Sequence, residues 1–278
     1  MRIACAQLKP TIGDVHANVE DASDAIADAA REGASLVVLP ELTTTGYVFE
    51  SREEALALGE AVPDGPASTR FLELARGLEI YVVVGMNEND RGRLFNTSAV
   101  FGPTGFIGRF RKVHLWDREN LWFQPGDLGF PVFETPIGRI ATFVCYDGWF
   151  PESYRACVLA GADMVCIPTN WVPIPGQDPT EPAMATYLCM ASAHVNGVVV
   201  AAADRVGVER GQEFIGQSVI VNYTGWPIAG PASREKTQML FADINLEAAR
   251  RARTWNAFND PVRDRRPESY TPMGRGPS

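Results

Sequence analysis

The chain has 278 residues, of which 46% are hydrophobic and 21% charged, values typical of a soluble globular protein with one large domain or two small ones. A formal net charge of −9 argues against nucleic acid or an anionic membrane surface as a partner. The first residues contain no long apolar segment, so we expect neither a signal peptide nor a transmembrane helix, and a cytoplasmic location.

The first part of the chain alternates short apolar runs with helical patterns. Residues 2–8 read as a buried strand, and apolar side chains then recur every three or four residues between Val15 and Ala29, which predicts a helix that ends near Gly33. The run SLVVLPE (35–41) is continuous enough for a fully buried strand. A helix over 67–76 precedes another buried strand, 80–85.

Two hairpins follow, with turns at 102–105 and near 136–138. Beyond them the pattern predicts helices over 152–160, 182–194 and 246–253, and strands over 163–169, 197–207, 215–221, 225–230 and 239–244. Buried strands mixed with helices and antiparallel hairpins indicate a layered α/β fold with two packed sheets. No linker divides the chain, so we expect one domain over 1–256 and a polar, proline-rich tail over 257–278, either disordered or docked on a partner subunit.

The five cysteines give no sign of a disulfide framework or a metal site. They contain no CxxC pair and have no histidine at zinc-ligand spacing, and they lie at positions 5, 145, 157, 166 and 189. We therefore expect neither a metal nor another cofactor.

Three reactive side chains end apolar runs: Glu41 in LVVLPE, Lys112 in FIGRFRK and Cys145 in IATFVC. Functional groups gather where strands deliver the chain into loops at one rim of a sheet. A carboxylate there can take the thiol proton, and an ammonium can stabilise both the thiolate and an oxyanion. Each residue taken singly is better explained as a core thiol or a surface charge, and we assign the other four cysteines to the core.

Three sequence blocks give these residues a family context. LPELTTTGY (39–47), RKVHLWDRE (111–119) and CYDGWFPE (145–152) resemble the signature blocks of the nitrilase, or carbon–nitrogen hydrolase, superfamily, in the same order. The resemblance covers nearly the whole chain up to about residue 257. It implies a four-layer α-β-β-α sandwich, homodimers or higher homo-oligomers in which the C-terminal tail reaches across the interface, and a Glu-Lys-Cys triad of Glu41, Lys112 and Cys145.

The same resemblance implies a second catalytic glutamate seven residues after the lysine, which is Glu119. In the expected mechanism Cys145 attacks an amide carbonyl and forms a thioester, with Glu41 as acid and base. The oxyanion is expected to bind Lys112 and the backbone N–H of Tyr146.

Aromatic side chains near the three blocks suggest the walls of a substrate pocket: Tyr47, Trp116, Trp149 and Trp171. Family members that act on carboxylates often carry arginine just after the cysteine, and here Tyr-Asp-Gly-Trp follows it. We therefore expect a small neutral aliphatic or aromatic amide as substrate. An N-carbamoyl amine or amino acid and a nitrile remain alternatives, and a catalytically silent partner-binding protein is the alternative of another class.

Overall fold

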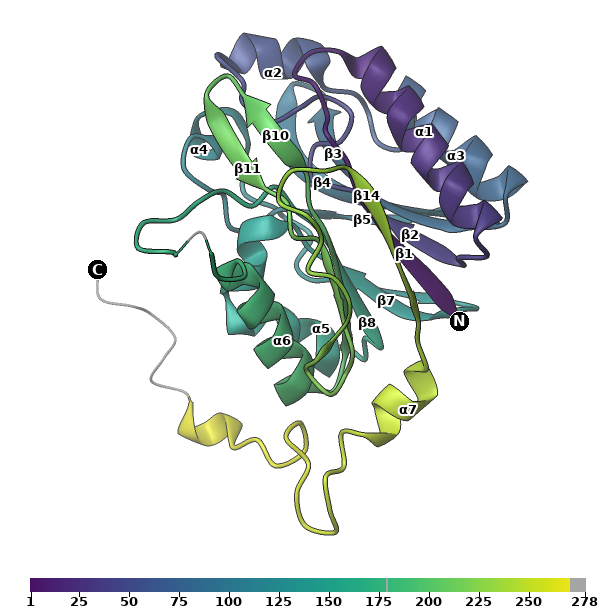
Figure 1. The fold of residues 1–278 in the computed structure, drawn as a ribbon, viewed down its shortest axis with the longest axis vertical. Helices are drawn as coiled ribbons and strands as arrows, with labels where there is room; N and C mark the ends of the chain where they lie inside the picture. Colours follow the sequence, from purple (N-terminus) through teal and green to yellow (C-terminus); the bar gives the residue numbers. More distant parts are fainter. Residues whose placement is uncertain (179, 271–278) are drawn as a thin grey trace.

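The computed structural model describes residues 1–178 and 180–270 and contains two six-stranded sheets packed face to face (Figure 1). The first sheet has the order β14-β1-β2-β3-β4-β5, with β1, β2 and β3 parallel and the other pairs antiparallel. Its strands are β1 (Arg2–Gln7), β2 (Leu36–Val38), β3 (Tyr81–Asp90), β4 (Arg93–Gly102), β5 (Gly105–Arg111) and β14 (Gln238–Asp243).

The second sheet repeats this plan with the order β13-β12-β9-β8-β7-β6, in which β7, β8 and β9 are parallel. Its strands are β6 (Val132–Thr135), β7 (Gly138–Thr142), β8 (Met164–Pro168), β9 (Val199–Ala203), β12 (Val219–Val221) and β13 (Pro227–Ala229). Both predicted hairpins are present, as β4–β5 and β6–β7.

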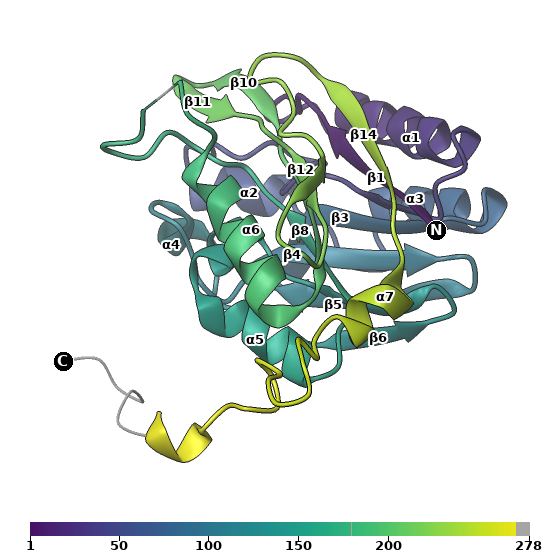
Figure 2. The ribbon, with the colours of Figure 1, turned by 60° about the horizontal axis from the view of Figure 1, so that its bottom comes forward.

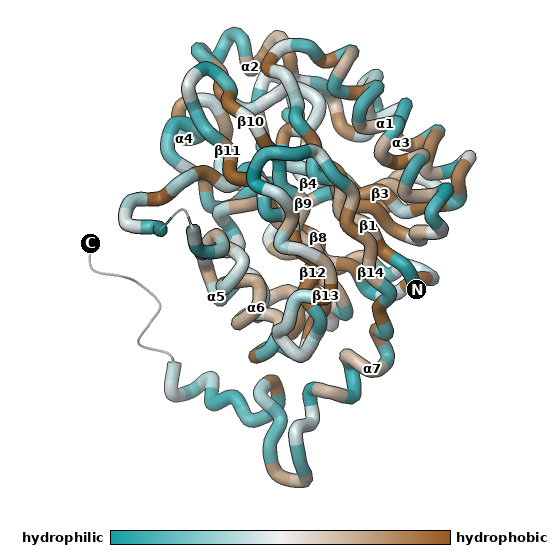
Figure 3. The backbone as a smooth tube through the Cα atoms, in the orientation of Figure 1, coloured by the Kyte–Doolittle hydropathy of each residue, from teal (hydrophilic) through white to brown (hydrophobic). Residues whose placement is uncertain are grey.

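Helices cover the outer face of each sheet. Apolar side chains of α1 (Val15–Arg31) and α3 (Pro66–Gly77) pack with the first sheet, and those of α5 (Pro151–Leu159) and α6 (Met184–Asn196) pack with the second. A third apolar cluster, with Val38, Val83 and Cys166 among its members, lies between the sheets. Figure 3 shows that the hydrophobic residues are concentrated in the strands and that the hydrophilic residues lie mostly outside them. The predicted four-layer α-β-β-α sandwich is confirmed.

The predictions missed three elements that lie around one end of the sandwich. These are helix α2 (Arg52–Leu58), helix α4 (Glu119–Trp122) and the separate hairpin of β10 (Val206–Glu209) and β11 (Gln212–Ile215). The predicted strand over 197–207 is in fact β9 and the start of β10, with Asp204 and Arg205 between them. A turn with positive φ at Arg210 and Gly211 closes the hairpin.

The chain after β14 forms α7 (Leu246–Arg251), and the described part of the tail passes beside α5 (Figure 2). The Trp255 ring stacks on His194 of α6, and Arg155 of α5 donates to the carbonyl of Pro261. The described part of the tail thus contacts helices of its own chain and includes a short 3-10 helix, Pro267–Ser269. The domain limits and the docking of the tail at a dimer interface stay predictions, and residues 271–278 lie outside the described part.

No helix in residues 1–178 and 180–270 is long and apolar enough to cross a membrane.

Gly85 of β3 allows the turn after β2 to approach the sheet closely. Its N–H donates to the Pro40 carbonyl at 3.0 Å, and its own carbonyl accepts from the Thr43 N–H at 2.9 Å. A Cβ at Gly85 would lie 2.4 Å from the Cα of Glu41, closer than side-chain carbons approach backbone. The space left by this glycine therefore sets where Glu41 lies.

We predict that Gly85→Ala lowers the free energy of unfolding by about 1–3 kcal/mol, because the added methyl group overpacks a rigid turn. Gly77→Ala is the matched control, since a Cβ there meets nothing within 4 Å. Urea unfolding of both variants measures the difference. Equal stability of the two variants would contradict the packing argument.

Candidate active site

The Lys112 ammonium lies between two carboxylates at the rim of the sandwich. Lys112 follows the last residue of β5 and is fully buried. Its Nζ donates to Glu41 Oε1 at 2.7 Å and to Glu119 Oε1 at 2.7 Å. Glu41 lies in the turn after β2, and Glu119 begins α4. Three elements far apart in the sequence thus bring two negative charges to one positive charge.

The three buried charges shift one another's protonation. Burial raises the pKa of Glu119 most and the nearby Glu41 charge raises it further, so that the pKa is about 7 although Lys112 and Tyr47 both lower it. Burial opposes the charge on Lys112, but the charges of Glu119 and Glu41 outweigh it and raise the pKa of Lys112 well above its usual range. Lys112 therefore stays protonated, while the Glu119 carboxyl group changes between its protonated and ionised forms near neutral pH.

Glu41 is fully buried, and hydrogen bonds fix one of its carboxylate oxygens and its backbone. Its Oε1 also accepts from Asn96 Nδ2 at 2.6 Å, and its backbone carbonyl accepts from Asn170 Nδ2 at 3.0 Å. Its second carboxylate oxygen, Oε2, is buried and has no hydrogen-bond partner within residues 1–178 and 180–270. Such an unpartnered acceptor is a ready place for a proton.

Cys145 begins a short 3-10 helix, Cys145–Trp149, with φ of +44°, a left-handed conformation that is strained for a side chain of this kind. Asp147 holds this turn, because its Oδ2 accepts from the Val144 N–H at 3.2 Å and its Oδ1 accepts from the His114 N–H at 2.9 Å. The His114 ring stacks on Phe150. Cys145 is partly exposed, whereas the other four cysteines are buried.

The Cys145 thiol is protonated at rest. Burial and the negative charge of Glu41 raise its pKa well above the ordinary value, and the Lys112 ammonium lowers it only in part. The thiol, Glu41 and Lys112 are thus close enough to act on one another's charge. A nucleophilic thiolate at this position requires a base to take the proton.

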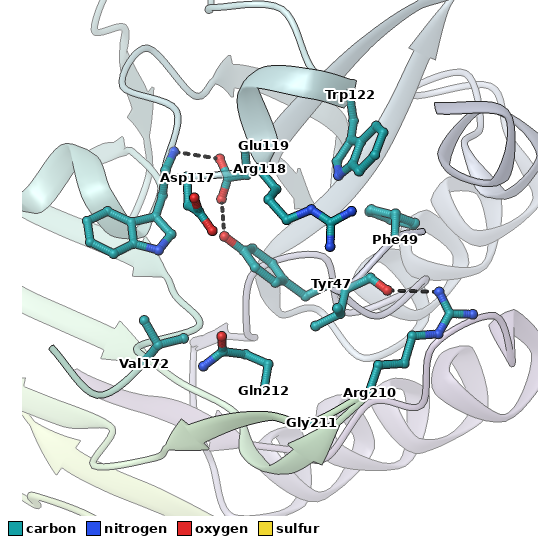
Figure 4. Close-up of a pocket in the computed structure, with 12 residues that line it drawn as sticks. Tyr47, Phe49, Asp117, Arg118, Glu119, Trp122, Val172, Arg210, Gly211 and Gln212 are labelled. Atoms are coloured by element: carbon teal, nitrogen blue, oxygen red, sulfur yellow. Dashed lines mark hydrogen bonds between the residues drawn. The ribbon is translucent and has the colours of Figure 1, made fainter. Parts of the chain in front are cut away.

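Several cavities open around these residues, of which one has Cys145 and Asn170 in its wall and another has Tyr47 and Glu119. The small one measures about 30 Å³ and is lined by Trp116, Cys145, Tyr146, Trp149, Asn170, Trp171, Val172 and Ile174. The larger one measures about 280 Å³ and is shown in Figure 4, where Tyr47 points its hydroxyl at Glu119 and Arg210 and Gln212 form the opposite wall. Trp116 and Val172 border both cavities, and Cys145 does not line the larger one.

The structure thus places the sequence-predicted residues in one region. Glu41, Lys112 and Glu119 are in direct contact, and Tyr146 follows Cys145 in the 3-10 helix. The aromatic residues divide between the cavities: Tyr47 lines the larger one, Trp149 and Trp171 line the smaller one, and Trp116 lines both.

Sequence reasoning missed three residues that hold the reactive groups, namely Asn96, Asp147 and Asn170. Asn96 lies inside β4, where a buried polar side chain in an apolar strand signals a specific partner. Asp147 lies inside the block CYDGWFPE, and Asn170 lies two residues after the last residue of β8, so their positions near a reactive residue or a strand end were the only available signals. Within the described ranges, no group of three or more histidine, cysteine, aspartate or glutamate side chains is placed to hold a metal ion.

Known proteins resemble this chain over almost its whole length. A nitrilase of Pyrococcus abyssi is 39% identical over 97% of this chain and 99% of its own. An N-carbamoylputrescine amidase of Arabidopsis thaliana is 30% identical over 92% of this chain and 90% of its own. The E41Q mutant of an amidase from Nesterenkonia sp. AN1 is 28% identical and superimposes with a TM-score of 0.79 over 98% of this chain and 99% of that one. Its structure shows the result of Michael addition of acrylamide at the active site cysteine.

The sequence profile of the carbon–nitrogen hydrolase family matches residues 2–254. Together with the sandwich, the buried charge cluster and these relatives, this match means that the chain belongs to the carbon–nitrogen hydrolase (nitrilase) superfamily and is a hydrolase of non-peptide carbon–nitrogen bonds.

Proposed function

We propose that the protein is a cysteine-dependent amidase that converts a small neutral carboxamide to its acid and ammonia. The observation that carries this proposal is the one partly exposed thiol, Cys145, beside a buried Lys112 that is shared by two carboxylates. This set supplies a nucleophile, a proton acceptor and a fixed positive charge without a histidine.

In the first half-reaction Glu41 takes the thiol proton as Cys145 Sγ attacks the amide carbon. The negative charge that develops on the carbonyl oxygen binds the Lys112 ammonium and the Tyr146 N–H. Glu41 then gives its proton to the nitrogen, the carbon–nitrogen bond breaks, ammonia leaves, and a thioester on Cys145 remains. The unpartnered Oε2 of Glu41 supports this shuttle, because it is the oxygen with room for a proton.

In the second half-reaction Glu41 takes a proton from water, whose oxygen attacks the thioester. Collapse of the intermediate breaks the carbon–sulfur bond and releases the carboxylic acid, and the thiol regains its proton from Glu41. In this proposal the ionised Glu119 orients Lys112 and accepts a hydrogen bond from the substrate amide nitrogen.

The small cavity favours short, uncharged acyl groups. It measures about 30 Å³, its walls are largely indole rings and aliphatic side chains, and no charged side chain lines it. A charged substituent there would lose its hydration without gaining a partner.

Hydrolysis of an N-carbamoyl amine is the second candidate. The larger cavity borders Glu119 and carries Asp117, Arg118 and Arg210 on its wall, so it offers room and polar partners for a substrate longer than a simple amide. The resemblance to a plant N-carbamoylputrescine amidase also favours this candidate.

We predict that the protein releases ammonia from acetamide, propionamide or benzamide faster than from carbamoylated amines, nitriles or succinamate. Cys145→Ser should lower kcat by at least about ten-thousand-fold while the circular dichroism spectrum is unchanged. Mass spectrometry of the wild-type enzyme under turnover should detect an acyl group on Cys145.

The control is Cys157→Ser, which changes a buried thiol of α5 outside this site. Full amidase activity in Cys145→Ser would contradict the mechanism. Preferred release from a carbamoylated amine would favour the second candidate, and no release from any compound would favour a partner-binding protein.

We predict that Glu41→Gln lowers the pKa of the Cys145 thiol and that Lys112→Met raises it. Glu41 raises the thiol pKa through its negative charge and Lys112 lowers it, so removal of each charge reverses its effect. The ultraviolet absorbance of the thiolate, taken as a difference from Cys145→Ser, measures both shifts. A shift of the same sign in the two variants would contradict the charge assignment.

A further inference from the structure

A second buried ion pair lies next to the site, and the proposed reaction does not use it. Arg205 Nη1 donates to Glu209 Oε1 at 2.7 Å, with both side chains almost fully buried. Arg205 precedes β10, and Glu209 is its last residue. Because burying two charges costs more hydration free energy than most pairs return, such a pair is weak evidence for stability and calls for another role.

The remaining oxygen of the Glu209 carboxylate binds the backbone of the Tyr47 turn. Glu209 Oε2 accepts from the Tyr47 N–H at 2.8 Å and from the Val48 N–H at 2.6 Å. Gly46 has a φ of +81°, and a Cβ there would lie 2.8 Å from Glu209 Oε1. The turn therefore sits directly against the carboxylate, 162 residues away in the sequence.

The same hairpin also supports the Tyr47 ring. Phe214 of β11 packs edge-to-face on that ring, with centroids 5.7 Å apart, and the Arg205 guanidinium lies 4.2 Å from the centre of the Phe214 ring. Arg205 Nη2 is itself fixed, because it donates to the Pro10 carbonyl at 2.7 Å. Tyr47 is thus held by its backbone and by its ring, and its hydroxyl donates to Glu119 Oε1 at 2.6 Å.

We propose that Glu209, fixed by Arg205, is a positioning residue that holds the Tyr47 hydroxyl on Glu119 and thereby sets the orientation and charge state of that carboxylate during amide hydrolysis. This proposal rests on the role of Glu119 in the proposed function. The separate β10–β11 hairpin, which follows β9 of the second sheet, then acts as a clamp on the turn after β2 of the first.

The clamp has a consequence for pH dependence. The groups that face Glu119 are Lys112 and Glu41, the Tyr47 hydroxyl, and the Trp116 N–H, which donates to Oε2 at 3.3 Å. A hydrogen bond to the charged form lowers the pKa of a carboxyl group, and Tyr47 makes such a bond. Releasing Tyr47 therefore raises the Glu119 pKa from about 7, and less of the carboxylate is ionised at neutral pH.

The experiment compares Tyr47→Phe, the paired change Arg205→Met with Glu209→Gln, and all three together. The paired change removes both charges at once, so no unpaired buried charge unfolds the protein. We expect the first two variants to lower kcat/KM at pH 7 by about tenfold and to move the acidic limb of the kcat/KM profile to higher pH. The triple variant should lose little more kcat/KM than either of the first two variants, because all the changes break the same chain of contacts from Arg205 to Glu119.

A carbon-13 NMR titration of labelled glutamate carboxyl groups, with the Glu119 signal assigned by Glu119→Gln, measures the expected rise of the Glu119 pKa without any need for turnover. A shifted titration in a protein that hydrolyses no amide would refute the proposed function and leave the clamp standing. Glu54→Gln is the matched control, because it breaks the pair between Glu54 of α2 and Arg210 at the hairpin turn. Within the described residues no hydrogen bond joins either of these side chains to Tyr47 or Glu119, so the Glu119 titration should be unchanged.

Two outcomes would overturn the proposal. The first is a paired variant that melts at a lower temperature but keeps the wild-type Glu119 titration and kcat/KM. The second is a triple change whose loss in kcat/KM is the product of the separate losses, since independent effects multiply in this way.

Discussion

The Lys112 ammonium, buried between Glu41 and Glu119, is the interaction on which the rest of the site depends. Burial first, and then the charge of Glu41 that the single ammonium does not fully offset, raise the Glu119 pKa to about 7. Burial and the same Glu41 charge also raise the pKa of the Cys145 thiol, which keeps it protonated. Burial and the excess of carboxylates over ammonium groups thus permit acid–base chemistry near neutral pH without a histidine, whose ordinary pKa lies in that range.

Burying such a cluster costs hydration free energy, and the surrounding strand ends place its groups close enough for their hydrogen bonds to offset part of that cost. Lys112, Cys145 and Asn170 follow the ends of β5, β7 and β8, so they come from both sheets to one rim. The Glu41 N–H donates to the Thr169 carbonyl at 3.4 Å, which joins the turn after β2 to the other sheet. The packing of the two sheets therefore determines the spacing of the reactive groups.

The sequence predicted what depends on local pattern and missed what depends on distant partners. Continuous apolar runs predicted β3 and β8, and reactive side chains at strand ends pointed to Glu41, Lys112 and Cys145, which the three blocks then placed in a family context. Helix α2 went unnoticed although Ser51 and Glu54 carry a capping signal, since the Ser51 hydroxyl accepts from the Glu54 N–H. The β10–β11 hairpin was hidden because it contains the buried charge of Glu209, with buried Arg205 just before it, where a strand pattern calls for apolar side chains.

The contacts that escaped prediction are the ones that give the site its precision. Residue types and strand ends predict that a thiol, an ammonium and carboxylates gather at a rim, but not the tenths of an ångström that decide proton transfer. That accuracy comes from hydrogen bonds such as Glu209 to the Tyr47 N–H and Asn96 to Glu41, whose partners are 162 and 55 residues apart. Substitutions in this supporting shell should therefore alter turnover and pH dependence while the triad itself remains intact.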